Sequence, residues 1–123
     1  MILVDTSVWS DHFRESEPSL VTLLNEGAVL IHHAIIEELA CGNLPRRKET
    51  LELLRALPEA PMAEHAEVLE FIGNERLHGT GVGSVDVHMM ASARLAGAKI
   101  WSKDKALCRE AKRLNLLSGV GPA

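Results

Sequence analysis

Three short strand-like runs, each followed by a helix-like stretch, restrict this chain most strongly to an α/β fold. They lie at residues 2–4, 28–31 and 98–101, and the first two contain no polar residue. A continuous apolar run is typical of a strand that is buried on both faces of a parallel sheet. Residues 61–63 are a candidate for a short strand or an extended linker, and residues 116–117 are a candidate for a brief edge strand. Strands that alternate with helices predict a sandwich built around a small, mostly parallel sheet.

Helical periodicity and stop signals account for most of the remaining sequence. We expect helices at residues 7–15, 19–26, 33–41, 46–57, 64–77, 85–96 and 104–114. Hydroxyl side chains stand before or at the start of three of these helices, where they accept hydrogen bonds from the free N–H groups of the first turn. We therefore expect Thr6 or Ser7, Ser84 and Ser102 to be helix caps.

The composition predicts one globular domain with an aliphatic core. Hydrophobic residues make up 46% of the 123 residues, whereas only two Trp and two Phe are present and Tyr is absent. Because the chain is short and shows no internal repeat, we predict a single domain over residues 1–123. The shortage of aromatic side chains argues against a surface on which single-stranded bases stack.

The chain carries no feature of a secreted or membrane-inserted protein. Its N-terminus has neither a basic segment nor a long apolar stretch, and no later segment is long enough to span a bilayer. Its two cysteines, Cys41 and Cys108, are too few for a disulfide framework, and we expect both to be reduced. We therefore predict a cytoplasmic protein without membrane contact.

Charge is distributed unevenly along the chain. The net charge of -4 argues against a general nucleic-acid-binding protein. However, residues 94–123 contain seven Lys or Arg and only two acidic residues, whereas acidic residues dominate residues 1–93. Two interpretations of the basic C-terminal part stay open: it contacts a phosphate backbone, or it forms a solvated helix face.

Acidic residues occur at comparable points after the predicted strands. Asp5 follows the first strand, Asp104 follows the strand at residues 98–101, and Asp86 lies in the first turn of an apolar helix. Glu37 and Glu38 lie in the helix after the second strand, and the helical spacing places Glu38 nearer the buried face. The carboxyl ends of parallel strands meet at one edge of the sheet, so these acids are expected to converge.

A cluster of carboxylates is typical of a divalent metal site. Buried like charges repel one another, and a cation between them removes this cost. Mg²⁺ and Mn²⁺ prefer oxygen ligands and bind through a few carboxylates together with water and substrate phosphates. Such a site supports hydrolysis of a phosphodiester bond by water. The sequence thus predicts metal-dependent hydrolysis without a protein nucleophile.

Four segments carry these acids: Ile-Leu-Val-Asp5-Thr-Ser-Val-Trp, Ile-Ile-Glu-Glu38-Leu-Ala-Cys-Gly, Val-Gly-Ser-Val-Asp86-Val-His-Met-Met-Ala-Ser-Ala and Gly-Ala-Lys-Ile-Trp-Ser-Lys-Asp104-Lys-Ala-Leu. In this order, and over nearly the whole chain, they resemble the successive motifs of PIN-domain ribonucleases. The match is nearest to the VapC toxins of toxin–antitoxin (VapBC) pairs. We call Asp5, Glu38, Asp86 and Asp104 the acidic tetrad.

The resemblance implies a PIN-like three-layer α/β/α sandwich in which the acidic tetrad binds Mg²⁺ or Mn²⁺. It also implies that Thr6 and Ser102 steady the carboxylates, as catalytic-site hydroxyls. The implied activity is that of a toxin endoribonuclease that hydrolyses RNA, for example in the loops of transfer or ribosomal RNA. The implied partners are a VapB-type antitoxin that covers the site with its C-terminal segment, the RNA substrate, and a second copy in a homodimer.

Two other functions remain alternatives at this stage. A phosphatase of the haloacid dehalogenase class also begins with an apolar strand that ends in Asp, but it needs a second acid two residues later, where this chain has Ser7. A catalytically silent PIN-like binding module would keep the fold without the chemistry. Metal binding that depends on Asp5 separates the enzyme from the silent module.

Overall fold

A parallel sheet of three short strands lies at the centre of the structure, a computed structural model that describes residues 1–120. The strands are β1 (Ile2–Val4), β2 (Val29–Leu30) and β3 (Lys99–Trp101), in the order β2-β1-β3. The helices are α1 (Thr6–Arg14), α2 (Pro18–Asn25), α3 (His33–Ala40), α4 (Arg47–Arg55), α5 (His65–Asn74), α6 (Ser84–Ala96) and α7 (Lys105–Arg113). The last three residues of the predicted domain 1–123 lie outside the described residues.

The central strand β1 pairs in parallel with both neighbours. Leu3 lies opposite Leu30 of β2 and Ile100 of β3, and Val4 lies opposite Trp101. Leu3, Val4 and Ile100 are completely buried because helices cover both faces of the sheet. The parallel sheet predicted from the apolar runs is therefore confirmed.

Single parallel bridges extend the sheet at both edges. Ile31, just after β2, pairs with Glu59, and Ile100 of β3 pairs with Leu117. The short strand considered for residues 61–63 is absent, since the chain pairs with the sheet before it reaches Pro61. The edge strand expected at 116–117 is reduced to this one bridge.

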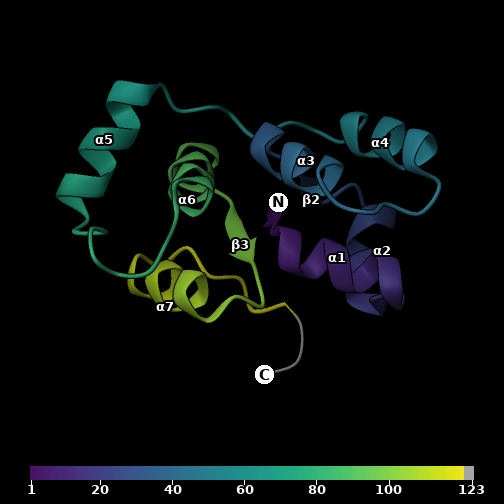
Figure 1. Cartoon of the computed structure of the whole chain (residues 1–123). Coiled ribbons are helices and arrows are strands. Elements are labelled where there is room, and N and C mark those ends of the chain that lie inside the picture. The colour runs from purple at the N-terminus through teal and green to yellow at the C-terminus, as the bar shows by residue number, and fades with distance from the viewer. Residues whose placement is uncertain (121–123) are drawn as a thin grey trace.

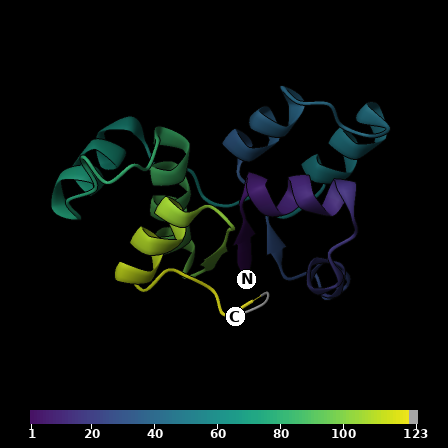
Figure 2. The same ribbon diagram turned by 60° about the horizontal axis from the view of Figure 1, so that its bottom comes forward.

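The helices form two layers, one on each side of the sheet. Helices α5, α6 and α7 lie on one side, and α1 to α4 lie on the other, in both views of the ribbon (Figures 1 and 2). The predicted α/β/α sandwich is therefore confirmed. Its core is mainly aliphatic, with Trp9 and Trp101 as its buried aromatic residues among those described. Within residues 1–120, no helix is both long and apolar enough to cross a membrane.

At the starts of α1 and α7, the residue that caps the helix is not the predicted one. Asp5 is the N-cap of α1 and accepts from the Ser7 N–H, and Asp104 is the N-cap of α7 and accepts from the Leu107 N–H. A carboxylate at this position satisfies a free N–H and also interacts favourably with the helix dipole. The structure therefore contradicts two predicted hydroxyl caps: Thr6 or Ser7 at the start of α1, and Ser102 at the start of α7.

Helix α6 begins one residue earlier than predicted, at Ser84 itself, and Gly83 is its N-cap residue. The predicted cap at Ser84 is therefore wrong as well. In its place, the Asp86 side chain reaches back and accepts from the Gly83 N–H at 3.2 Å. A carboxylate in the first turn thus takes over the capping role that the sequence assigned to a hydroxyl.

Candidate active site

The ends of β1 and β3 hold the Asp5 carboxylate in a fixed position. The Asp5 N–H donates to the Trp101 carbonyl at 2.9 Å, which continues the strand pairing by one residue. The side chain is buried, with the residue only 6% exposed, and its Oδ2 accepts from the hydroxyls of Ser102 and Ser7, each at 2.7 Å. Within residues 1–120 the other oxygen, Oδ1, accepts no hydrogen bond from the protein.

Ser102 connects Asp5 to Asp104. Its hydroxyl donates to Asp5 Oδ2 and accepts from the Asp104 N–H at 3.0 Å. Asp104 Oδ1 is occupied by the Leu107 N–H at 2.9 Å, and the residue is exposed. One buried hydroxyl therefore couples two members of the acidic tetrad that come from opposite ends of the sequence.

Ser7 has the same kind of role, and the sequence analysis missed it. Its hydroxyl donates to Asp5 Oδ2 and accepts from the Lys103 N–H at 2.9 Å, so it also joins the end of β1 to the end of β3. A local signal was present, because an Asp side chain commonly accepts a hydrogen bond from the backbone N–H two residues later, which brings Ser7 beside the Asp5 carboxylate. In the sequence, Ser7 had served to suggest a helix cap and to argue against a second acid at this position, but not as a support for Asp5.

Glu38 reaches the site from α3 through Thr6. The Thr6 hydroxyl donates to Glu38 Oε1 at 2.7 Å and so ties the first residue of α1 to α3. Both residues line a groove of about 510 Å³ between these helices, with Phe13, Leu39 and Leu44 among its apolar lining residues. Glu38 is thus exposed to solvent and at the same time held by a hydroxyl of the neighbouring helix.

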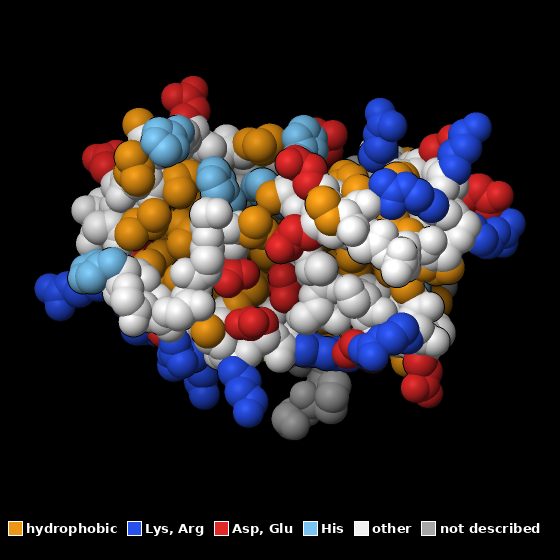
Figure 3. All heavy atoms as spheres, viewed as in Figure 1, with side chains coloured by type: hydrophobic (Ala, Val, Ile, Leu, Met, Phe, Trp, Pro, Cys, Tyr) orange, Lys and Arg blue, Asp and Glu red, His pale blue; other side chains and the backbone are white. Residues whose placement is uncertain are grey.

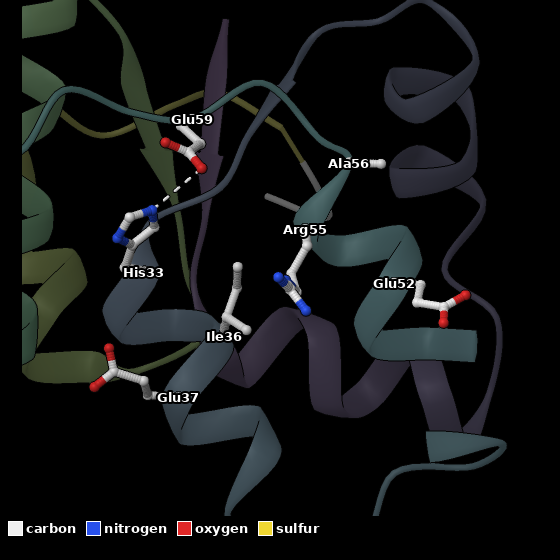
Figure 4. A pocket seen from close by; sticks show the side chains of 7 residues that line it. All are labelled: His33, Ile36, Glu37, Glu52, Arg55, Ala56 and Glu59. Atoms are coloured by element: carbon white, nitrogen blue, oxygen red, sulfur yellow. Dashed lines mark ion pairs between the residues drawn. The ribbon is translucent and has the colours of Figure 1, made fainter. Parts of the chain in front are cut away.

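Glu37 points away from this groove and lines a different cavity. That cavity, of about 670 Å³, lies between α3 and α4 and is lined by both Glu37 and Arg55; in Figure 4 Arg55 lies between the two helices, whereas the Glu37 carboxylate is turned away from α4. His33 and Glu59 close one side of it with an ion pair of 3.2 Å between His33 Nε2 and Glu59 Oε1. The structure therefore places adjacent glutamates in separate environments, and Glu38 is the one whose charge acts on Asp86.

The pKa of Asp86 responds to the charges of the other three members of the acidic tetrad. Burial raises the pKa of the Asp86 carboxyl, the Gly83 N–H partly opposes this shift, and the charges of Asp5, Asp104 and Glu38 raise the pKa further. This mutual influence means that the four carboxylates share one electrostatic environment. The residues predicted from four distant parts of the sequence are thus brought together.

The four carboxylates share this environment without forming a closed coordination shell. Within residues 1–120, no three His, Cys, Asp or Glu side chains are arranged as a ready-made metal-binding group. Figure 3 shows the face of the molecule that Figure 1 presents to the viewer. Acidic side chains gather in the middle of this face, and Lys and Arg lie mostly towards its rim. An all-oxygen donor set with unrelieved negative charge fits Mg²⁺ or Mn²⁺, which keep several water ligands and need only a few carboxylates.

Most of the basic residues near the C-terminus have partners within the protein. Side chains of Arg94, Lys99, Lys103, Arg109 and Arg113 donate to carboxylates or backbone carbonyls. Lys105 and Lys112 are exposed and make no side-chain hydrogen bond or ion pair within the described part of the chain. Among the seven basic residues at positions 94–113, these are the two whose side chains have no partner within the described residues.

Comparison with known proteins agrees with this fold. The family model for the PIN domain matches residues 2–113 of the chain. The chain is 44% identical over 108 residues to Ribonuclease VapC32 of Mycobacterium tuberculosis, in strain CDC 1551 / Oshkosh and equally in strain ATCC 25618 / H37Rv. These alignments cover 87% of this chain and 87% of each relative.

Two solved structures share the fold. FitAB bound to an IR36 DNA fragment matches with a TM-score of 0.64 and 18% identity, over 91% of both chains. FitAcB from Neisseria gonorrhoeae matches with a TM-score of 0.59 and 19% identity, over 91% of this chain and 94% of that one. At this identity the likeness concerns the arrangement of helices and strands.

Proposed function

Since this chain belongs to the PIN-domain family and to its VapC group, we propose that it is an endoribonuclease that acts as the toxin of a toxin–antitoxin pair. The 44% identity to Ribonuclease VapC32 over most of both chains supports this activity. The observation that carries the proposal is the electrostatic coupling of Asp86 to the other three acids of the tetrad. We place the enzyme in the cytoplasm, where its RNA substrate is found.

The acidic tetrad is proposed to hold Mg²⁺ or Mn²⁺. A bound divalent ion polarises the phosphodiester and stabilises the charge that develops on its oxygens. The carboxylates accept hydrogen bonds only, so their free oxygens also orient the attacking water. Asp5 is suited to this role because Oδ2 is held by two hydroxyls while Oδ1 remains available.

The hydroxyl residues are proposed to orient the carboxylates and to take no part in bond making. Thr6 holds Glu38, and Ser102 and Ser7 hold Asp5, each through a hydrogen bond of 2.7 Å. A carboxylate held in this way loses little additional freedom when the substrate binds. Such preorganisation keeps the charges aligned with the reacting phosphate.

The proposed partners are RNA, a VapB-type antitoxin and a second copy of the chain. The groove between α1 and α3 supports the antitoxin, because its apolar lining leads directly to Glu38. A peptide segment seated there would cover the acidic tetrad and block access of RNA. Membership in the VapC group supports both the antitoxin and the homodimer.

Cleavage of total transfer RNA by the purified, antitoxin-free protein tests the proposed function. We expect discrete fragments with Mg²⁺ or Mn²⁺, and none with EDTA or in Asp5→Asn. Asp11→Asn is the matched control, because it makes the same change in an acid of α1 that pairs with Lys103 and Arg14. Loss of cleavage in Asp5→Asn alone assigns the activity to the tetrad.

Metal binding separates the enzyme from a silent PIN-like module. If Mn²⁺ binds in an Asp5-dependent manner but transfer RNA stays intact, the substrate is a different RNA, and ribosomal RNA is tested next. If the protein neither binds Mn²⁺ nor cleaves either RNA, the enzymatic proposal is wrong. The fold would then serve a binding role.

A further inference from the structure

Glu110 is a buried carboxylate outside the acidic tetrad. Its side chain on α7 is only 7% exposed and lies between two guanidinium groups. Arg109 Nε donates to Oε2 and Arg113 Nε donates to Oε1, each at 2.9 Å. A buried carboxylate is costly unless both oxygens are satisfied, and these two charge-assisted hydrogen bonds satisfy them.

Both arginines also hold the segment that connects α5 to α6. Arg113 Nη2 donates to the Glu75 carbonyl at 2.6 Å, and Arg109 Nη2 donates to the Thr80 carbonyl. Because a guanidinium is planar, fixing Nε on Glu110 also fixes the direction of Nη2. We call Glu110, Arg109, Arg113 and the two carbonyls that they hold the arginine clamp.

The held segment lies against α7. Arg76, Gly79 and Gly81 have φ values of 53°, 71° and 91°, so the backbone repeatedly enters the left-handed region between α5 and α6. A Cβ atom on Gly81 would lie 3.7 Å from the Cβ of Ala106 on α7. The segment thus packs on α7, and the arginine clamp provides the side-chain hydrogen bonds from α7 that hold it there.

The arginine clamp joins the two chain segments that lead to Asp86 and Asp104. The held segment ends at Gly83, whose N–H donates to Asp86 Oδ2 at 3.2 Å, and α7 itself begins directly after Asp104. We propose that Glu110 is a positioning residue that, through the arginine clamp, sets the Asp86 carboxylate relative to Asp104. This inference rests on the proposed function, since the relative position of the two acids matters only if they bind metal together.

Mn²⁺ binding to the purified protein, measured from the free Mn²⁺ signal in electron paramagnetic resonance, tests the inference without RNA. In Glu110→Gln the side chain keeps its size but presents an amide N–H₂ to one of the arginines. We expect the dissociation constant for Mn²⁺ to rise about tenfold, the lower end of the effect of residues that support metal ligands. The circular dichroism spectrum is expected to remain that of the wild type.

A stability control and a second variant make the result specific. Leu54→Val removes buried volume on α4, away from the tetrad, and is expected to lower the melting temperature without changing Mn²⁺ affinity. Arg109→Met leaves Glu110 paired with Arg113 and frees the Thr80 carbonyl, so it tests the clamp even if Glu110→Gln fails to fold. Combining Arg109→Met with Glu110→Gln is expected to add little, because both act through one unit.

The wild-type protein separates failure of the inference from failure of the proposed function. If the wild type binds Mn²⁺ and cleaves RNA while the folded clamp variants bind Mn²⁺ equally well, Glu110 is structural only and the inference is wrong. If the wild type itself shows neither Mn²⁺ binding nor cleavage, the proposed function falls and the inference falls with it. A weakened affinity in the clamp variants, with Leu54→Val unchanged, supports positioning.

Discussion

The hydroxyl of Ser102 lies 2.7 Å from Asp5 Oδ2, although the two residues are 97 positions apart in the chain. The contact is buried, and it forms where β1 and β3 end side by side. The same hydroxyl accepts from the Asp104 N–H. Ser102 is therefore the point at which the sheet joins two acids of the proposed metal site.

Ser102→Ala is expected to lower both stability and RNA cleavage. It removes a charge-assisted hydrogen bond to a buried carboxylate, which typically contributes about 1.5–3 kcal/mol. Because Asp5 also loses part of its support, we expect cleavage to fall about tenfold or more. Urea unfolding followed by circular dichroism and a transfer RNA cleavage assay measure the two effects.

Ser92→Ala is the control for this substitution. Ser92 is fully buried on α6, but its hydroxyl has no hydrogen-bond partner within the described residues. Removing an unsatisfied buried hydroxyl is expected to leave stability unchanged or slightly higher. Equal losses in the two alanine variants would contradict the role given to Ser102.

Adjacent glutamates on α3 allow a comparison within one helix. Glu38→Gln removes a proposed metal ligand that Thr6 holds, whereas Glu37→Gln changes an exposed side chain that lines the other cavity. We expect Glu38→Gln to lose more than the ~10–100-fold typical of residues that only support a ligand, and Glu37→Gln to cleave like the wild type. Initial rates of cleavage at saturating Mn²⁺ measure the difference, and the opposite order would assign the site to Glu37.

Asp86→Asn is expected to stabilise the metal-free protein at neutral pH. The raised pKa of Asp86 means that the native state holds this proton more tightly than the unfolded chain does. Native stability therefore falls as the pH rises from the ordinary value of 3.8 through the raised pKa. Asn carries no charge, so the variant avoids this loss.

Thermal melts in EDTA test the pH dependence. We expect Asp86→Asn to melt a few degrees above the wild type at pH 7. The gain should shrink towards zero well below pH 3.8, where Asp86 is protonated in both states. A gain that is independent of pH would mean that the effect does not come from the charge of Asp86.

Lys105 and Lys112 are the residues with which to test whether the basic C-terminal part contacts RNA. Both are exposed, and neither side chain is committed to a partner within residues 1–120. If each contacts one phosphate, alanine at either position lowers the salt dependence of RNA binding by about one in the slope of log K against log salt. Binding of catalytically inactive Asp5→Asn variants is measured at several salt concentrations. Lys48→Ala, an exposed change on α4, is the control, and equal slopes for all three would favour a merely solvated face.

The order of strands and helices was predictable because each run is locally unambiguous. Residues 2–4 have no polar side chain, and the sheet buries Leu3 and Val4 completely. The helices appear where periodicity predicted them, with shorter ends at α4 and α5. Helix α5 ends at Asn74. The backbone at Arg76 is in the left-handed region, so the helix does not reach Leu77, as the apolar spacing had predicted.

The helix caps were predicted less well, because tertiary contacts decide them. A hydroxyl beside a helix start is a good local cap, but Ser7 and Ser102 are both drawn to the buried Asp5 carboxylate. The carboxylates of Asp5 and Asp104 then cap the helices themselves. Local preference is thus outweighed by the need to satisfy one buried charge.

Sequence position alone also cannot say which basic residues are free. Arg109 and Arg113 belong to a cluster of positive charges in the sequence, yet both are bound to Glu110 and to carbonyls on the segment before α6. These partners lie up to 38 positions away. Counting charges therefore does not show which basic side chains remain available for RNA.

The single-residue bridges at the sheet edges limit how other chains attach to this protein. Ile31 exchanges hydrogen bonds with Pro58 and Ala60, and Ile100 does so with Leu116 and Ser118, so both outer rows of backbone groups are already occupied. A free edge would accept an additional strand from a partner or from an aggregating copy. A strand added to β2 or β3 would first have to displace residues 58–60 or 116–118 of the protein's own chain, so an inhibitory partner is expected to bind through side-chain grooves and helix surfaces.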